Sequence, residues 1–260
     1  MVEVRPGWLI AAYTPTAFFS LRGTLSTSTG GATLFVPTPY AIKLALVDAA
    51  YRMHGDDLAR KVFKWVRDCE VRIKPPRSLV VNHTFTKIRQ TARPSKETVE
   101  QEDSDKIDEL NEDSENPKTP YTANIGYREY CAYQGTMEIA LQRGDWAEED
   151  ERLIGKLFAH INYLGKRGSF LQYLGWQVQL DLPGGFSILP EEWDRLNPNL
   201  YGVLQYLDDV GKGTWTDLFE RINSYADKNL KLKEHRVLRQ YLLPYKRRKS
   251  AKSFTYYSSG

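Results

Sequence analysis

The chain has 260 residues, of which 41% are hydrophobic, and a formal net charge of +3 at pH 7. This length suffices for one large domain or two small ones. No uninterrupted apolar run approaches the roughly 18 residues of a membrane helix. The start lacks a secretory signal, and two cysteines (Cys69 and Cys131) are too few for a disulfide framework. We therefore expect a globular, cytoplasmic protein with no membrane partner.

The charge is unevenly distributed along the chain. Residues 97–115 hold ten acids and one base, a net of −9, which leaves +12 for the rest. A chain this basic outside one acidic segment can attract a polyanion. The alternative is that the charge serves only solubility.

The N-terminal third predicts a strand followed by two helices. Residues 8–23 are aromatic and β-favouring, with a possible interruption at Pro15, and a flexible Gly/Ser/Thr connector follows. Thr38 can cap a helix with Pro39 in its first turn, and this apolar helix runs to Gly55. Its Lys43 either extends its amine to solvent or reaches a ligand. A second helix begins at Asp56.

Two long segments of strand composition come next, residues 78–90 and 123–142. They predict one long hairpin that projects from the body as an arm, because both faces near its tip are polar, basic or aromatic. The acidic insert between them, about residues 94–119, is too poor in apolar residues to offset its ordering entropy and is predicted to be disordered.

A helix with acids in its first turn and an apolar stripe is predicted from residue 146, with Gly165 as its left-handed C-cap. A strand follows at about 170–182. The order of elements is then close to βαββαβ, the ferredoxin-like unit, and the fold class is α+β. Residues 183–260 are predicted to form a helical C-terminal extension with a basic tail.

The junction Gly165-Lys-Arg-Gly-Ser-Phe170 places two cations between two glycines. Glycines let a backbone approach a ligand closely, and Ser169 can donate to a phosphate, so the motif predicts a phosphate contact. The alternative is purely structural, because cations also complement the dipole at a helix C-terminus.

No metal or nucleophile constellation is visible: the four histidines lie far apart in sequence, and no cofactor is expected. His83 with Tyr127 or Tyr130 and a lysine could form a metal-independent ribonuclease centre. A structural or base-contacting role for His83 is the alternative. The 16 tyrosines and 6 tryptophans beside basic residues fit single-stranded RNA recognition.

The stretches TPYAIKLALVDAAYR and INYLGKRGSFLQY resemble the CRISPR-associated Cas-five family of RAMP proteins. The likeness covers residues 34–54 and 146–175. It implies a ferredoxin-like domain (residues 1–182) with a long β-hairpin thumb (about 75–142), followed by the extension (183–260).

The resemblance implies a non-catalytic subunit of a type I Cascade complex that binds the 5′ handle of crRNA and supports RNA-guided DNA targeting. The implied partners are that RNA, a Cas-seven-type backbone subunit, the large subunit and, indirectly, target DNA. The expected RNA-binding residues are Arg22, Tyr40, Lys43, Lys87, Arg89, Tyr127, Arg128, Lys166, Arg167 and Ser169. One branch of the family cleaves precursor crRNA itself, so metal-independent endoribonuclease activity is the alternative. A third possibility is a subunit that only bridges proteins, with its basic surface against acidic partners. The acidic insert departs from the family, because it should repel RNA.

Overall fold

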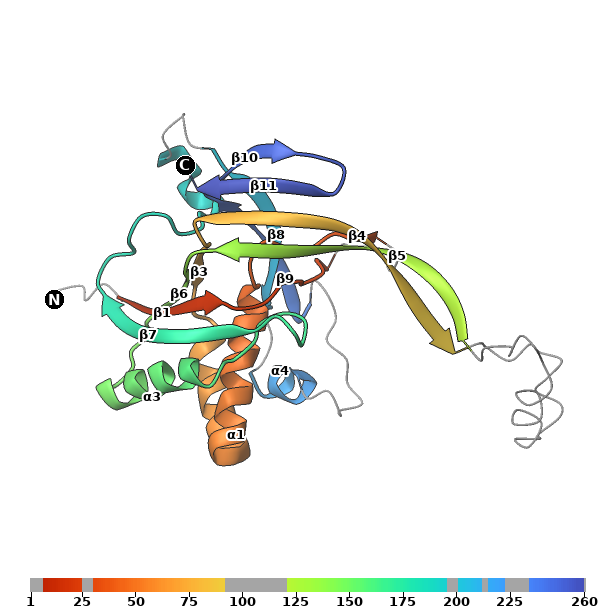
Figure 1. Cartoon of the computed structure of the whole chain (residues 1–260). Helices are drawn as coiled ribbons and strands as arrows, with labels where there is room; N and C mark the ends of the chain where they lie inside the picture. The colour runs from red at the N-terminus through yellow and green to blue at the C-terminus, as the bar shows by residue number, and fades with distance from the viewer. Residues whose placement is uncertain are drawn as a thin grey trace, which may run out of the picture.

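The computed structural model describes residues 7–24, 30–91, 121–195, 201–211, 215–222 and 234–259. Across these ranges the protein is mixed α/β, with antiparallel sheets and few helices (Figure 1). The predicted mixture of helices and strands is confirmed. The acidic insert at 94–119 lies outside the described residues. No described helix is both long and apolar enough to cross a membrane.

One sheet has four described strands in the order β3–β6–β1–β7, and every neighbouring pair is antiparallel. The strands are β1 (Trp8–Pro15), β3 (Val71–Lys74), β6 (Met137–Gln142) and β7 (Leu171–Gln179). Alternate residues of β1, Leu9, Ala11 and Tyr13, are fully buried because a strand turns every second side chain to the same face. β1 ends at Pro15, where the sequence predicted a possible interruption of the strand.

Two helices pack on one face of this sheet, α1 (Pro39–Val66) and α3 (Glu148–Ala159) (Figure 1). The Thr38 side chain accepts a hydrogen bond from the Ala41 N–H at 3.1 Å, which confirms the predicted N-cap. The predicted break at Gly55 is confirmed: the backbone is non-helical at His54 and Gly55, where Gly55 adopts φ +77°, so α1 consists of two helical segments that meet at a kink.

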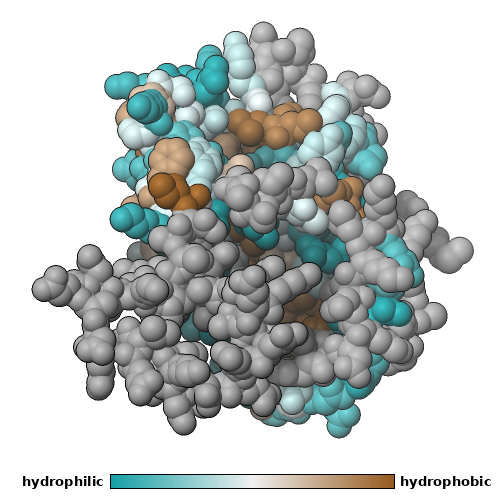
Figure 2. Space-filling model, turned by 90° about the vertical axis from the view of Figure 1, so that its right-hand side faces the viewer, coloured by the Kyte–Doolittle hydropathy of each residue, from teal (hydrophilic) through white to brown (hydrophobic). Residues whose placement is uncertain are grey.

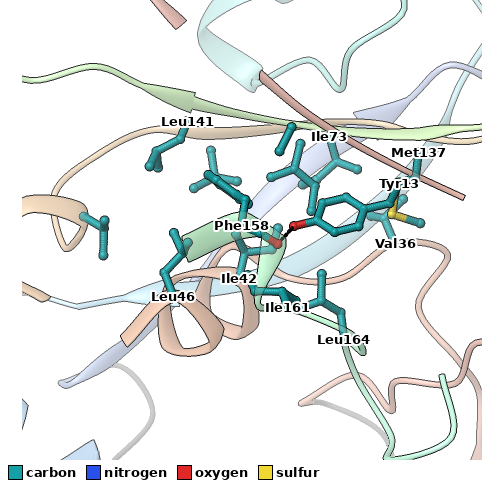
Figure 3. Close-up of a cluster of buried hydrophobic side chains, with 14 of the residues drawn as sticks. Tyr13, Val36, Ile42, Leu46, Ile73, Met137, Leu141, Phe158, Ile161 and Leu164 are labelled. Carbon is teal, nitrogen blue, oxygen red and sulfur yellow. Dashed lines mark hydrogen bonds between the residues drawn. The ribbon is translucent and has the colours of Figure 1, made fainter. Parts of the chain in front are cut away.

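α3 ends at Ala159 and its C-cap is His160, so the prediction that Gly165 caps this helix is wrong. The chain leaves the helix earlier because Ile161 and Leu164 turn into the core, where they are 3% and 2% exposed. Figure 3 shows both side chains beneath Tyr13. The Tyr13 hydroxyl donates to the Phe158 carbonyl at 2.7 Å, so its buried polar atom has a partner.

The second sheet has five described strands in the order β10–β11–β4–β5–β2, in which β2 is Gly30–Gly31, β10 is Tyr245–Ser250 and β11 is Phe254–Ser259. β4 (Ser78–Thr91) and β5 (Tyr121–Gln134) pair without interruption along their whole length and reach far from the body (Figure 1). The predicted strand at 123–142 is in fact two strands. The chain turns at Gly135, with φ +108°, and β6 then enters the other sheet.

The prediction of a helical C-terminal extension is only partly correct. Its described residues hold only the short helices η1 (Pro190–Arg195) and α4 (Trp215–Ile222). They also hold four strands: β8 (Val203–Val210), β9 (Arg236–Leu243), β10 (Tyr245–Ser250) and β11 (Phe254–Ser259). β8 pairs with β9, and β11 pairs with β4, so the end of the chain completes the sheet that carries the hairpin. The domain boundary at residue 182 stays a prediction.

Candidate nucleic-acid interface

The loop Gly165–Ser169 is held in place by its own backbone and by residues 19–21. The Lys166 N–H donates to the Ser20 carbonyl at 3.0 Å, and the Ser169 N–H donates to the Lys166 carbonyl at 2.9 Å. Gly165 adopts φ +90°, and a Cβ there would lie 3.1 Å from the Phe19 ring. Glycine is therefore required at 165, and the loop has a defined shape.

The two loop cations are free to meet a ligand. Lys166 and Arg167 are exposed, and neither forms an ion pair with a carboxylate among the residues that the structure describes. The Lys166 Nζ lies 5.9 Å from the centre of the Tyr130 ring on β5. Phe18, which is 60% exposed, lies beside the same ring, with the ring centres 6.5 Å apart. We call Phe18, Tyr130, Lys166 and Arg167 the loop–hairpin cluster.

Gly168 differs from Gly165, because a Cβ built at Gly168 would meet no atom within 4 Å. The fold does not require glycine at this position. The open space leaves the backbone beside Arg167 accessible to a ligand.

Ser169 does not act as predicted. Its side chain is 2% exposed, and its hydroxyl oxygen accepts a hydrogen bond from the Ser20 N–H at 3.1 Å. Ser169 therefore fixes the loop to the segment before it, and it cannot donate to an external phosphate from this position.

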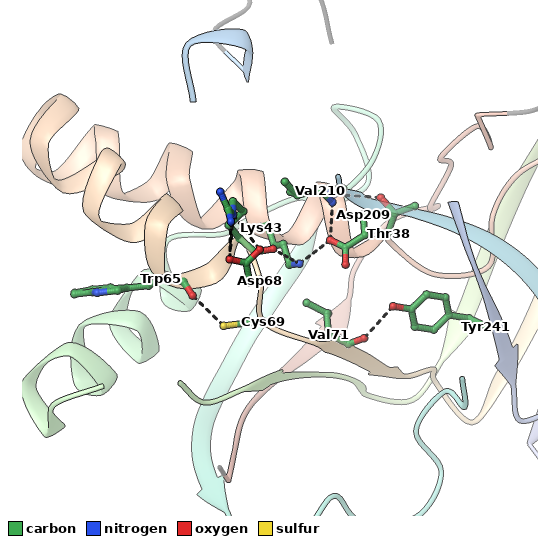
Figure 4. Close-up of polar contacts among 11 residues, drawn as sticks. Thr38, Lys43, Trp65, Asp68, Cys69, Val71, Asp209, Val210 and Tyr241 are labelled. Atoms are coloured by element: carbon green, nitrogen blue, oxygen red, sulfur yellow. Dashed lines mark hydrogen bonds and ion pairs between the residues drawn. The ribbon is translucent and has the colours of Figure 1, made fainter. Parts of the chain in front are cut away.

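Lys43 is also removed from the set of possible phosphate contacts. It is 1% exposed, and its ammonium group lies 2.6 Å from Asp209 Oδ1 in β8 (Figure 4). It donates a second hydrogen bond to the Arg67 carbonyl at 2.8 Å. Burial raises the pKa of Asp209, an effect that Lys43 opposes. A lysine with these partners holds β8 against α1 and does not face solvent.

Tyr40 likewise contacts the C-terminal strands. The guanidinium carbon of Arg236 in β9 lies 4.6 Å from the centre of its ring, and Arg236 is paired with Asp208. Burial raises the pKa of Tyr40 to about 12. Arg22, by contrast, is exposed, and its backbone forms an isolated antiparallel β-bridge with Thr33.

The predicted hairpin residues have different surroundings. Lys87 is exposed, whereas the side chain of Arg89 lies outside the described residues. Arg128 is half-buried, and its guanidinium donates to the Tyr127 carbonyl at 2.8 Å. It also packs against Gly31 of β2 (Gly30–Gly31), the short strand beside β5.

Tyr127 belongs to a polar cluster at the base of the hairpin. Its hydroxyl donates to Glu129 Oε1 at 2.8 Å and lies 2.7 Å from His83 Nδ1. The other ring nitrogen of His83 lies 3.2 Å from the Thr255 hydroxyl on β11. Burial and the contact with Glu129 raise the pKa of Tyr127 to about 12. The cluster joins β4, β5 and β11 where the hairpin leaves the body.

Sequence reasoning placed His83 beside a tyrosine but missed Glu129 and Thr255, because β11 lies more than 160 residues away along the chain. It also missed the contact between Lys166 and Tyr130. Within the described ranges, no group of three or more His, Cys, Asp or Glu side chains is arranged to hold a metal ion. In the coloured upper part of Figure 2, which views the side from which the hairpin projects, hydrophobic and hydrophilic residues are intermixed.

No family model matches the chain. The chain is 26% identical over 218 residues to the CRISPR-associated protein Cas5 of Archaeoglobus fulgidus, and the match covers 82% of each protein. The predicted resemblance to the Cas5 family is confirmed.

Two solved structures are also similar to the chain. A CRISPR protein from Archaeoglobus fulgidus has a TM-score of 0.43 and 10% identity, covering 98% of this chain and 92% of that one. A chain of a CRISPR RNA-guided surveillance complex has a TM-score of 0.39 and 15% identity, covering 91% and 90%.

Proposed function

We propose that this protein is a Cas5-like subunit of a CRISPR Cascade complex and binds the 5′ handle of crRNA without cutting it. The likeness to Cas5 supports the assignment to a CRISPR complex. The observation that carries the binding role is the loop–hairpin cluster, in which the exposed Lys166 lies over the Tyr130 ring of the projecting hairpin. Cations that hold phosphates beside rings that stack bases are the usual means of binding single-stranded RNA.

The topology supports a ferredoxin-like body. The chain order β1, α1, β3, β6, α3, β7 follows the βαββαβ pattern, and the antiparallel sheet places β1 and β6 between β7 and β3. In this reading the β4–β5 hairpin is the thumb. The Cas-seven-type backbone subunit and the large subunit of the complex are the proposed protein partners.

The proposal uses a smaller set of residues than the sequence suggested. Lys166 and Arg167 neutralise handle phosphates, and Arg22 and Lys87 are the further exposed cations of the predicted set. Phe18 and Tyr130 receive bases. Lys43, Tyr40 and Ser169 act within the protein, because each is engaged by another part of the chain.

The test is a titration of handle RNA with the Lys166→Ala/Arg167→Ala variant at several salt concentrations. We expect about tenfold weaker binding per cation, since a charge-assisted hydrogen bond contributes about 1.5 kcal/mol or more. The salt slope should fall by about 0.7 for each single-strand phosphate that is no longer neutralised.

The matched control is Lys64→Ala/Lys156→Ala, which removes the same charge from exposed positions on α1 and α3. Wild-type affinity in the Lys166→Ala/Arg167→Ala variant, or equal loss in the control, would contradict the assignment.

A second function, metal-independent cleavage of precursor crRNA, is favoured by one observation: the 2.7 Å contact between Tyr127 and His83. An imidazole and a phenol this close can move a proton to or from a reacting hydroxyl. Both ring nitrogens of His83 already have partners, however, and no described lysine forms a hydrogen bond or ion pair with the cluster.

Incubation of the protein with repeat RNA in EDTA separates the two functions. The binding role predicts that the RNA stays intact. Discrete products that disappear in the His83→Ala variant would establish the nuclease instead.

A further inference from the structure

The sheet formed by β10, β11, β4 and β5 has one buried face and one open face. Leu79, Val81 and Cys131 line the buried face and are at most 2% exposed. The side chains that alternate with them, including Asn82 and Tyr130, point to the opposite face and are partly exposed. We call this opposite face, as formed by β5, β4, β11 and β10, the outer sheet face.

A row of side chains crosses the outer sheet face. Tyr130 on β5 is paired with Asn82 on β4, and Asn82 is paired with Phe254 on β11. The two rings therefore stand two strands apart, roughly 10 Å, on the same face. Both rings are partly exposed. Tyr256, also partly exposed, lies on this face as the partner of Val80.

Each end of the row carries a lysine above a ring. The Lys166 Nζ lies 5.9 Å from the centre of the Tyr130 ring, and the Lys249 Nζ lies 5.9 Å from the centre of the Phe254 ring. The two lysines come from different elements, a loop after α3 and the edge strand β10. A cation over a ring keeps its full charge, because the ring does not neutralise it as a carboxylate would.

β10 extends the positive charge along the edge of the sheet. The hairpin formed by β10 and β11 carries five cations and no acid, and none of the five pairs with a described carboxylate. The Lys246 Nζ lies 4.0 Å from the centre of the exposed Tyr201 ring, and Arg248 donates to the Ser258 hydroxyl. The five are Lys246, Arg247, Arg248, Lys249 and Lys252.

Charges on an edge strand also prevent sheets from joining edge to edge, and that role alone would explain cations on β10. It does not explain the partly exposed rings in the middle of the sheet, or why the row ends in a lysine on the side remote from β10. Rings that alternate with unpaired cations on an open sheet face are suited to splayed bases and their phosphates.

We propose that the outer sheet face binds unpaired nucleotides of a single-stranded polynucleotide, with bases on Tyr130 and Phe254 and phosphates on Lys166, Lys249 and Lys246. Stacking on a ring tolerates any base, so this surface binds without reading sequence. The inference rests on the proposed function only at its Lys166 end. It adds β11 and β10, which that function does not use.

The test measures the binding of a labelled 15-nucleotide uridine-only RNA, which lacks any handle sequence, to the full chain. Phe254→Leu and Tyr130→Leu should each weaken binding by about 5- to 100-fold, the equivalent of about 1–3 kcal/mol for the removal of one stacked base. Their salt slopes should stay unchanged, because no cation is removed. The control Tyr51→Leu replaces an exposed tyrosine on α1 and should bind like the wild type.

Lys246→Ala/Lys249→Ala should weaken binding and lower the salt slope by about 0.7 for each phosphate that is no longer neutralised. A thymidine-only DNA of equal length and an RNA duplex are run in parallel. Tight binding of either single strand supports the proposal. The strand that binds more tightly shows whether the surface prefers RNA or DNA. Binding of the duplex as tight as that of the single strands would overturn it.

Wild-type affinity in a folded Phe254→Leu variant would also overturn the proposal. If that variant does not fold, photocrosslinking of a 5-bromouridine RNA to the wild-type protein tests the proposal instead. Adducts should map to the peptides that contain Tyr130 and Phe254, and adducts confined to other peptides would contradict the proposal.

The outcome is separable from the handle test. If Phe254→Leu loses uridine binding while Lys166→Ala/Arg167→Ala binds the handle as before, the outer sheet face is supported as a binding surface and the handle-binding role of the loop is contradicted. If Phe254→Leu binds uridine RNA as before while Lys166→Ala/Arg167→Ala loses handle binding, the loop is supported and the outer sheet face is contradicted.

Discussion

Lys43 and Lys166 are two lysines for which the sequence predicts the same role, and the structure gives them opposite surroundings. Lys43 is 1% exposed and paired with Asp209. Lys166 is exposed on a loop, and its ammonium group lies 5.9 Å from the centre of the Tyr130 ring. Lys43, a lone cation on an apolar helix, is paired within the protein. Lys166, which lies between two glycines, is exposed and available to an external anion.

The difference follows from solvation. A buried ammonium loses its hydration, and this loss is tolerable only when a carboxylate and further hydrogen-bond partners replace the water. Lys43 has Asp209 and the Arg67 carbonyl. Lys166 keeps its water and can exchange it for a phosphate. Removal of the first lysine should therefore change stability, and removal of the second should change binding.

The largest expected effect is on the buried pair. Lys43→Met leaves Asp209 buried and unpaired, so the free energy of unfolding should fall by about 3–5 kcal/mol. Urea denaturation followed by circular dichroism measures it. The double variant Lys43→Met/Asp209→Asn should recover part of the loss, because no unpaired charge remains. A single variant as stable as the wild type would show that the pair is not formed.

The two loop glycines give a matched comparison. Gly165→Ala should lower the free energy of unfolding by about 1–3 kcal/mol, because an alanine at φ +90° is strained and its Cβ meets Phe19. Gly168→Ala should change stability by less than about 0.5 kcal/mol. The same denaturation measurement compares them, and equal losses in both variants would show that Gly165 does not fix the loop.

Alkaline pH should weaken the base of the hairpin. Burial and Glu129 raise the pKa of Tyr127 to about 12 from its ordinary 10.0, so the folded protein holds this proton more tightly than the unfolded chain. The resulting stability is complete below pH 10 and is lost as the pH rises towards 12. Urea unfolding between pH 8 and pH 11 should show a steeper loss in the wild type than in Tyr127→Phe. Identical profiles would contradict this role of Tyr127.

The smallest expected effect is on the stability of the loop variant. Lys166→Ala/Arg167→Ala should unfold within about 0.5 kcal/mol of the wild type, because both side chains are exposed and neither forms an ion pair in the part of the chain that the structure describes. A thermal-shift comparison checks this. A clear destabilisation would mean that these cations act within the fold, like Lys43.

Local patterns predicted the elements whose signals lie within one segment. β1, the capped start of α1, α3 and the paired strands of the hairpin all follow from periodicity, caps and β-favouring composition. The turn at Gly135 was missed because composition continues unchanged from β5 into β6. Among the C-terminal strands, β10 was missed because it lies at an edge, where charged residues replace the apolar alternation that marks a buried strand.

Contacts between distant segments could not be predicted. Asp209 lies 166 residues from Lys43, and the contact between Lys166 and Tyr130 depends on how the loop packs beside β5. The sequence could name the candidate cations. Only the packing of β8 on α1 separates the structural lysine from the one available to RNA.

The most direct measurement is a structure of the protein bound to handle RNA, alone or within its complex. The account predicts phosphates within ion-pair distance of Lys166 and Arg167, a base against Tyr130 or Phe18, and Lys43 still paired with Asp209. An RNA strand that lies elsewhere, with the loop pointing into solvent or into a neighbouring protein, would contradict it.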